Sequence, residues 1–305
     1  MKAVVFGGSG FLGSHVADAL TDKGHEVTVF DLKPSPYISA SQRMVVGDIM
    51  DEASVSESLS GADVVYNFAG LADIEEAKVK PLETIRFNVL GNTVLLECSR
   101  KAGVKRFVYA STLYVYSKTG SFYRSSKQAS ELIIENYYET FGLPYTILRY
   151  GSLYGPRSDE RNWIYRSLKQ ALTEGKIVRH GDGEEIREYI HVKDAAVASV
   201  DILSNEFLNQ TVIITGYQQI KIKELMLMIK EMLENKISLE FLPPSETYHY
   251  EITPYTFAPR VGKRLVSKSY HDLGQGIMEC LYDIYKKVHH YPTLNGLVIK
   301  DEKAR

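Results

Sequence analysis

Cysteine is scarce in this chain, which holds Cys98 and Cys280 and no others among its 305 residues. Each lies in an apolar pattern with helical spacing, so we expect both to be small buried residues. Two isolated cysteines form neither a disulfide framework nor the ligand spacing of a metal site. The sequence therefore predicts no bound metal and favours the reducing cytoplasm.

A large net charge and long apolar runs are also missing. The 36 Lys and Arg residues nearly balance the 38 Asp and Glu residues, which gives no bulk attraction to nucleic acid or to an anionic membrane. No apolar run reaches the roughly 20 residues that a membrane-spanning helix needs. The first residues already read as a strand, so we expect no signal peptide. We expect a soluble globular protein with one large domain or two coupled domains.

The chain begins with the pattern of a buried strand, a glycine-rich turn, a helix and a second strand that ends at Asp31. Glycines let the backbone approach a pyrophosphate closely, and the N-terminus of the helix faces its negative charge. A carboxylate at Asp31 can accept hydrogen bonds from ribose hydroxyls, and it would repel a 2′-phosphate. The pattern predicts a dinucleotide site that prefers NAD to NADP, with its glycines at Gly7, Gly10 and Gly13.

Strand-like and helix-like segments alternate up to residue 155, which is typical of a parallel sheet, and we expect a Rossmann-type, doubly wound α/β fold. Ligands in such sheets bind beyond the carboxyl ends of the strands, where Thr112 follows the predicted strand 107–110. Asp48 follows the predicted strand 43–46 and could either contact adenine or cap the next helix. The other predicted elements are strands 3–6, 27–30, 64–70 and 145–149 and helices 14–23, 81–100 and 123–141.

Beyond residue 155 the alternation loosens. The sequence predicts a NAD-binding domain of residues 1–155, to which residues 187–216 return. Residues 156–186 and 217–305 are expected to form a smaller C-terminal α/β substrate-binding domain. The elements predicted here are helix 163–174, extended segment 187–192, a helix capped by Asp194, strand 211–215, helix 222–233 and a last helix, 273–288.

Tyr123 and Lys127 are four residues apart in a predicted helix, so the phenol and the ammonium share one face. A free phenol titrates near 10, which is too high for a base at neutral pH. A neighbouring ammonium and a cationic nicotinamide ring would lower the pKa of the phenol and make the pair a proton-transfer device. Tyr114 and Lys118 have the same spacing, so spacing alone does not identify the base.

These motifs resemble those of the extended short-chain dehydrogenase/reductases, specifically the NAD-dependent epimerase/dehydratase branch that acts on nucleotide sugars. The resemblance covers nearly the whole chain, and only Tyr123 has the Ser-Lys and the trailing Glu of the family helix. It rests on Gly7-x-x-Gly10-x-x-Gly13, Asp31, Asp48-Ile49, Asn67-Phe-Ala-Gly70, Asn88-Val-x-Gly91, Ser111-Thr112-x-x-Val115-Tyr116, Tyr123-x-x-Ser126-Lys127-x-x-x-Glu131, Arg149-Tyr-Gly-x-x-Tyr-Gly-Pro156, Arg187-Glu-Tyr-Ile-His-Val-x-Asp194 and Arg260-Val-Gly262.

The resemblance implies hydride transfer with NAD kept bound. Tyr123 would take a proton from a sugar hydroxyl, Lys127 would hold the nicotinamide ribose, and Thr112 would bond the reacting oxygen. Arg187 and Arg260 resemble the arginines that clamp a nucleotide diphosphate. The cofactor contacts that the resemblance implies, besides Tyr123 and Lys127, are Gly7, Gly10, Phe11, Leu12, Gly13, Asp31, Asp48, Ile49, Ala69, Gly70, Asn88 and Ser111.

The residues after Thr112 bear on the reaction. Dehydratases of the family have Asp-Glu there and decarboxylases usually Ser-Glu, whereas this chain has Leu113 and Tyr114. Asp31 opposes the NADP that reductases often use. The sequence therefore favours C4 epimerisation of an NDP-hexose through a transient keto sugar. The alternatives are another nucleotide-sugar reaction (decarboxylation, reduction or epimerisation at another carbon) and a non-catalytic NAD-binding regulatory protein.

The remaining predictions concern the substrate and a second copy of the chain. The segment from Tyr116 to Tyr123 is shorter than is usual in the family, which leaves Tyr114 available to line the substrate site. Ser152 stands where the family commonly has Asn, a contact to the substrate phosphates. The two helices near 81–100 and 123–141 resemble the dimerising pair of the family, so we expect a homodimer.

Overall fold

The structure is a computed structural model that describes residues 1–217, 219–244, 251–252 and 254. Arg260, Cys280 and the predicted helix 273–288 lie outside the described residues. Cys98 is 3% exposed, as predicted for a small core residue.

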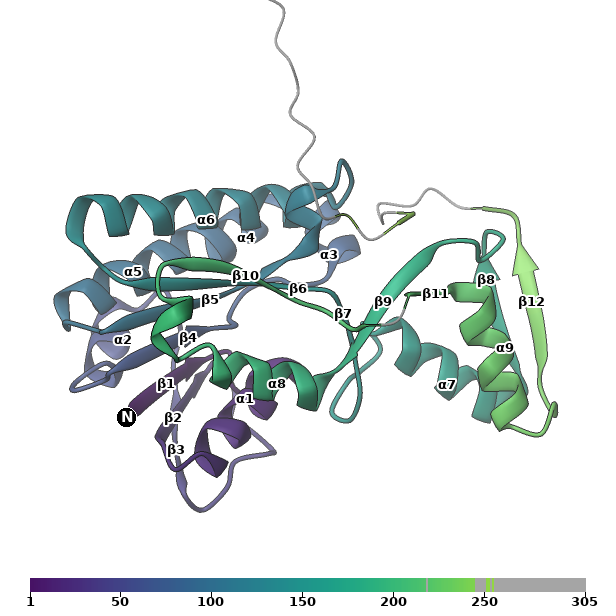
Figure 1. Cartoon of the computed structure of the whole chain (residues 1–305), viewed down its shortest axis with the longest axis horizontal. Coiled ribbons are helices and arrows are strands. Elements are labelled where there is room, and N and C mark those ends of the chain that lie inside the picture. Colours follow the sequence, from purple (N-terminus) through teal and green to yellow (C-terminus); the bar gives the residue numbers. More distant parts are fainter. Residues whose placement is uncertain (218, 245–250, 253, 255–305) are drawn as a thin grey trace, which may run out of the picture. The chain divides into compact units, whose positions relative to one another are not determined.

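A seven-stranded sheet in the described part of the chain has the order β10-β6-β5-β4-β1-β2-β3 (Figure 1). All of its neighbouring strands are parallel. The order reverses between β1 and β4, which is the switch point where doubly wound sheets bind ligands. The strands are β1 Lys2–Phe6, β2 Glu26–Asp31, β3 Gln42–Val46, β4 Val64–Asn67, β5 Arg106–Thr112, β6 Tyr145–Tyr150 and β10 Gln210–Ile214.

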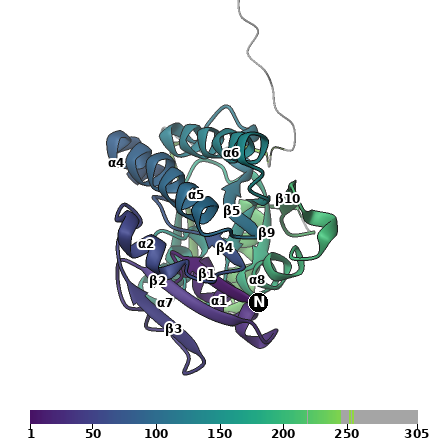
Figure 2. The same ribbon diagram turned by 90° about the vertical axis from the view of Figure 1, so that its left-hand side faces the viewer.

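Helices cover both faces of this sheet (Figure 2). Alternate residues of β1 point to opposite faces, so Ala3 and Val5 join one core and Val4 and Phe6 join the other. The first core is closed by α1 Phe11–Asp22 and α8 Val192–Asp201, and the second by α2 Glu52–Ser58, α5 Asn92–Lys101 and α6 Ser121–Phe141. The predicted α/β fold is therefore confirmed.

The predicted helix 81–100 is not one regular helix. It consists of α4 Pro81–Ile85, a π-helical turn Arg86–Gly91 and α5. Asn88 lies in the π-helical turn, where its Nδ2 donates to Leu71 O and to Ser126 Oγ, each at 2.9 Å. The wider turn places this side chain between β4 and α6, and such turns are frequent at functional sites.

Helix α6 begins at Ser121, two residues before the predicted start, and ends at Phe141, where its C-cap Gly142 has φ +71°. Its buried face is largely polar, which is unusual for a helix against a sheet, because it includes Ser126, Lys127, Ser130 and Glu131. The helix therefore presents functional groups, rather than only apolar side chains, to the end of β5.

Apart from α3 Ile74–Val79, which contacts α6, and the short 3-10 turns, the remaining described elements form a second group. The strands β11-β9-β7 form one small sheet and β12-β8 another, and residues of α7 and α9 share an apolar core with Ile177. The sequence did not predict β7, β8, β11 or β12, which lie where the alternation of strands and helices loosens and have 3 to 5 residues each. The bounds are β7 Ser152–Tyr154, α7 Trp163–Glu174, β8 Lys176–His180, β9 Ile186–His191, β11 Gln219–Lys221, α9 Ile222–Met232 and β12 Ser238–Leu242.

The predicted cap of α8 is wrong. Asp194 lies inside the first turn, and the N-cap is His191, whose Nδ1 accepts a hydrogen bond from Lys193 N at 3.4 Å. Strand β9 runs into α8 without a loop, so the capping position falls on the last residue of the strand. His191 therefore has a structural role.

In the part of the chain that the structure describes, no helix combines the length and the apolar character that crossing a bilayer requires.

The buried guanidinium of Arg106 ties the start of β5 to the segment just beyond α8. Arg106 is 6% exposed at the start of β5, and its Nη1 donates to Ile202 O at 2.6 Å and to Ser204 O at 3.1 Å, just beyond α8. Arg106→Met leaves these carbonyls without their donor, so we expect the free energy of unfolding to fall by about 1–3 kcal/mol in urea titrations. Lys105→Met is the control, because that side chain is 77% exposed. Equal losses would contradict the assignment.

Candidate active site

The glycine-rich turn is pressed against the exit of β4. Gly7 has φ +74°, and a Cβ there would lie 2.6 Å from the backbone nitrogen of Ala69. A Cβ on Gly13 would lie 2.3 Å from the carbonyl oxygen of Gly7. Only glycine fits these two positions, so the turn brings bare backbone to the switch point of the sheet.

Helix α1 starts from this turn with an uncapped N-terminus. Gly10 is its N-cap, no side chain caps it, and its first turn contains no acidic residue. The backbone N–H groups of Phe11, Leu12 and Gly13 have no partner within the helix. Three such donors with the positive end of the helix dipole fit the pyrophosphate of a dinucleotide.

Asp31, at the end of β2, is tied to the same turn. Its Oδ2 accepts from Ser9 N at 3.0 Å and its Oδ1 from Lys33 N at 3.4 Å. The carboxylate is thus held beside the turn, where a ribose would lie. Its charge there opposes a 2′-phosphate.

For Asp48 the structure removes one of the two alternatives. Its Oδ1 accepts from Met50 N at 2.9 Å. The cap of α2 is Asp51, which accepts from Ala53 N and Ser54 N. Capping by Asp48 is therefore wrong, because the turn places Asp51 at the N-cap, and the adenine contact stays a prediction.

Asn88 holds the exit of β4. Its Oδ1 accepts from Leu71 N at 2.7 Å, and a Cβ on Gly70, where φ is +137°, would lie 2.4 Å from that oxygen. Ser126 Oγ, which accepts from the Asn88 amide, donates to Tyr123 O at 2.8 Å. This chain of contacts ties the predicted cofactor segment around Gly70 to the start of α6.

The structure brings Thr112, Tyr123 and Lys127 to the carboxyl end of β5. Thr112 ends that strand and is 5% exposed. The Lys127 Nζ lies 5.8 Å from the centroid of the Tyr123 ring and donates to Ala110 O at 2.7 Å. Strand and helix thus place a hydroxyl, a phenol and an ammonium in one region, as predicted.

The second Tyr-x-x-x-Lys match does not share a helix face. Tyr114 lies in a short 3-10 turn, Leu113–Tyr116, whereas Lys118 follows that turn in irregular, exposed backbone. The Tyr114 ring instead packs edge-to-face against Tyr123, with centroids 6.2 Å apart, and Tyr114 N donates to Thr112 Oγ1 at 3.2 Å. Tyr114 is therefore a neighbour of the predicted base.

Burial controls the charge of Lys127. Desolvation lowers the pKa of its ammonium to about 8, and the carboxylate of Glu131 opposes that shift. A pKa of about 8 keeps the ammonium largely protonated at pH 7. A cation beside Tyr123 favours the phenolate form of that phenol.

Glu131 and Arg149 form a buried ion pair whose place in the site the sequence reasoning missed. Arg149 Nε and Nη2 donate to the Glu131 carboxylate at 3.0 and 2.5 Å, and the two side chains are 18% and 7% exposed. Ser111 Oγ donates to the same carboxylate. Arg149 also lies 4.6 Å from the Tyr116 ring centroid. Glu131 is the trailing Glu of the helix motif, and its presence was the sequence feature that could have indicated this pair.

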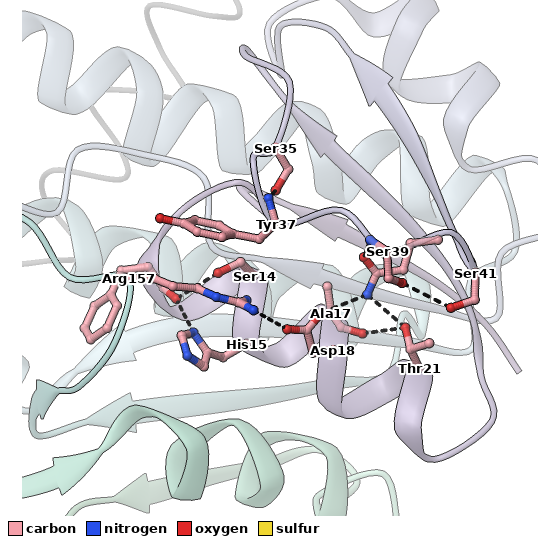
Figure 3. Close-up of polar contacts among 12 residues, drawn as sticks. Ser14, His15, Ala17, Asp18, Thr21, Ser35, Tyr37, Ser39, Ser41 and Arg157 are labelled. Carbon is pink, nitrogen blue, oxygen red and sulfur yellow. Dashed lines mark hydrogen bonds and ion pairs between the residues drawn. The ribbon is translucent and has the colours of Figure 1, made fainter.

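Arg157 was not predicted either. Figure 3 shows it beside α1, where it pairs with Asp18 at 2.8 Å and lies 4.5 Å from the centroid of the Tyr37 ring. Arg157 follows β7, and Tyr37 belongs to the segment that follows Asp31. The contact therefore joins the segment after β7 to the predicted cofactor region.

The predicted substrate residues are placed only in part. Arg187 is 7% exposed, and its Nη1 donates to Ile186 O at 2.9 Å and to Glu251 O at 3.1 Å. Ser152 is half-buried in β7. A pocket of about 1110 Å³ lies between α7 and β8, and the residues that line it include Trp163, Arg166, Gln170, Arg179 and Glu185 but none of the three catalytic candidates.

Comparisons with known proteins agree with this geometry. The family model described as NAD dependent epimerase/dehydratase family matches residues 3–214. A curated relative, the UDP-N-acetyl-alpha-D-glucosaminuronate decarboxylase of Bacillus cytotoxicus, is 27% identical over 81% of this chain and 85% of its own length.

Two solved structures of UDP-glucose 4-epimerases are similar as well. The Thermotoga maritima protein, solved with UDP-glucose, has a TM-score of 0.77 and 26% identity over 84% of this chain and 90% of that one. The Thermus thermophilus protein, solved with NAD, has a TM-score of 0.75 and 25% identity over 86% and 95%. With its glycine turn, its carboxylate at Asp31 and its Tyr123–Lys127 pair, this chain belongs to the NAD-dependent epimerase/dehydratase family of extended short-chain dehydrogenase/reductases and uses NAD.

Proposed function

We propose that the chain is an NAD-dependent nucleotide-sugar 4-epimerase. The observation that supports it most directly is the grouping of Thr112, Tyr123 and Lys127 at the end of β5. The family acts on nucleotide sugars through NAD, and the finer assignment to C4 rests on the residues after Thr112. Neither Leu113 nor Tyr114 carries the carboxylate that elimination of water needs. Leu113 is fully buried in the core, and Tyr114 packs on Tyr123.

In the proposed reaction, Tyr123 acts as the base that removes the proton of a sugar hydroxyl. Lys127 favours the phenolate through its charge. Thr112 bonds the reacting oxygen, because a hydroxyl can donate and accept in turn. NAD supplies the redox chemistry by accepting and returning hydride. The keto sugar turns over between the two transfers, and Tyr123 then returns the proton.

The proposed binding residues extend along both parts of the chain. Residues 1–155 with 187–216 would bind NAD, and residues 156–186 with 217–305 would bind the nucleotide sugar. Arg187 and Arg260 are proposed to hold the diphosphate, with Tyr114 and Ser152 near the sugar. The proposed NAD contacts are Gly7, Gly10, Phe11, Leu12, Gly13, Asp31, Asp48, Ile49, Ala69, Gly70, Asn88, Ser111, Tyr123 and Lys127.

A decarboxylase is the second candidate. The similarity to a curated relative named as a UDP-N-acetyl-alpha-D-glucosaminuronate decarboxylase favours it. Both reactions would begin with oxidation at C4, so Tyr123 and Lys127 would have the same roles. They differ in whether the substrate carries a carboxylate and whether CO₂ is released.

A substrate screen tests the proposed function. Purified protein is incubated with UDP-, GDP-, CDP- and dTDP-hexoses and hexuronic acids, without added NAD, and the products are identified by NMR. We expect two C4 epimers to interconvert without net NADH. Release of CO₂ from a uronic acid would identify the decarboxylase, and steady NADH production a dehydrogenase. Bound NAD without any turnover would favour a regulatory protein.

Tyr123→Phe tests the base. This variant keeps the ring but loses the phenol, so we expect turnover to fall by about 10²–10⁴-fold, while NAD content measured by absorbance after denaturation stays unchanged. Tyr114→Phe is the matched control, because it removes a phenol from the neighbouring ring, and we expect it to retain most turnover. An inactive Tyr114→Phe beside an active Tyr123→Phe would reverse the assignment.

We also propose a homodimer through the helices near 81–100 and 123–141. Large apolar side chains are exposed there, including Leu82 at 85% and Leu132 at 61%. A second copy would bury them in a four-helix contact.

The oligomeric state tests this proposal. In the double variant Leu82→Glu/Leu132→Glu, carboxylates would have to be desolvated in the contact, so we expect sedimentation analysis to give the monomer mass. Leu172→Glu in α7 is the control, since Leu172 is 74% exposed outside these helices, and it should leave a dimer. A wild-type monomer, or a double variant that stays dimeric, would refute the proposed interface.

A further inference from the structure

The Glu131 carboxylate holds the last residues of β5, which position both the Lys127 ammonium and the Thr112 hydroxyl. It accepts a hydrogen bond from Ser111 Oγ. Ser111 stands between Ala110, whose carbonyl accepts from the Lys127 ammonium at 2.7 Å, and Thr112. One carboxylate on α6 therefore holds the short stretch of strand that positions both the ammonium and the catalytic hydroxyl.

The same carboxylate acts on Lys127 through its charge. Burial disfavours the ammonium, and Glu131, one helical turn along α6, is the charged group that opposes this lowering of the Lys127 pKa. The other titratable groups that face Lys127 are phenols, Tyr109 from β5 with its ring centroid at 4.7 Å and Tyr123 from α6 at 5.8 Å. Burial raises the pKa of Tyr109, so that phenol adds no negative charge at neutral pH.

Arg149 limits the negative charge that reaches Lys127. It holds Glu131 through two parallel hydrogen bonds from β6, and it also bonds the phenol of Tyr116. A bidentate pair fixes both the position and the orientation of a carboxylate. By pairing with Glu131, Arg149 offsets part of the negative charge of that carboxylate, so removal of Arg149 should strengthen the effect of Glu131 on Lys127.

We propose that Glu131 and Arg149 are positioning residues for the reaction, which set the protonation of Lys127 and hold the end of β5. Neither side chain needs to touch substrate or cofactor for this role. The inference rests on the proposed role of Lys127 in proton transfer and adds a means by which the fold adjusts it.

The titration of Lys127 provides a direct test. The full-length protein, saturated with NAD, carries lysine labelled with ¹³C at Cε, and the Lys127 signal is assigned by its loss in Lys127→Met. The midpoint of its NMR titration is then measured in wild type, Glu131→Gln, Arg149→Met and the double variant Glu131→Gln/Arg149→Met. Glu97→Gln is the control, because Glu97 pairs with Arg100 on α5 at 2.7 Å.

The expected shifts have opposite signs. Glu131→Gln removes the opposing negative charge and leaves Arg149 unpaired, so the midpoint should fall by about one pH unit or more. Arg149→Met leaves an unpaired carboxylate beside Lys127, so the midpoint should rise. Turnover should follow, with its alkaline limb moving to lower pH in the first variant and to higher pH in the second. Glu97→Gln should change neither.

A purely structural role would give a different pattern. Both single variants would then lose stability without moving the Lys127 midpoint, and that result, or shifts of the same sign, would overturn the inference. If an unpaired buried charge prevents a single variant from folding, the double variant still tests it, because it contains no unpaired charge. Glu131 is the stronger influence on Lys127, so the double variant should still have a lowered midpoint, and an unchanged midpoint overturns the proposal.

The experiments distinguish a failure of this inference from a failure of the proposed function. The NMR titration needs no substrate, so the shifts can be seen even if no nucleotide sugar is converted, which would contradict the proposed function alone. Conversely, normal epimerase activity in Glu131→Gln with an unshifted Lys127 would contradict this inference and leave the epimerase intact.

Discussion

The buried ammonium of Lys127 is the feature on which the rest of the candidate site depends. A charge removed from water is costly unless it has partners, and here the partners are the Ala110 carbonyl, the face of the Tyr109 ring and the field of Glu131. These groups come from β5 and α6, so the strand and the helix must keep one relative position. That position also brings Tyr123 and Thr112 to the carboxyl end of β5, so the electrostatic requirement of one lysine becomes a geometric constraint on the proposed proton-transfer group.

Close backbone packing is the second constraint. Gly7 lets the turn after β1 lie against the exit of β4, Gly13 lets α1 approach the carbonyl of Gly7, and Gly70 leaves room for the Asn88 side chain. Asn88 reaches that place because the helix widens into a π-helical turn, and it then contacts Ser126 on α6. The predicted cofactor turn and the helix that carries Tyr123 are therefore joined by a chain of contacts through the exit of β4.

Much of the fold and the centre of the site could be predicted, because they depend on local patterns. The strand, glycine turn, helix and Asp31 at the start, and the spacing of Tyr123 and Lys127, are properties of short segments. The strands β7, β8, β11 and β12 were missed, because they lie where the alternation of strands and helices loosens and all but β7 contain charged residues. The role of Asp194 as a cap was wrong because strand β9 meets α8 without a loop.

The sequence by itself determined the α/β class and the use of NAD, because a glycine turn followed by a strand that ends in a carboxylate leaves few alternatives, and it supplied the candidates for proton transfer. The motif of the family helix already favoured the Tyr123 match, and the tertiary structure showed that the other match shares no helix face, since Lys118 leaves the short turn of Tyr114. The tertiary structure also revealed the Glu131–Arg149 pair and the contact of Arg157 with Asp18. These pairs join residues distant in sequence, and no local pattern records which side chains a folded sheet brings together.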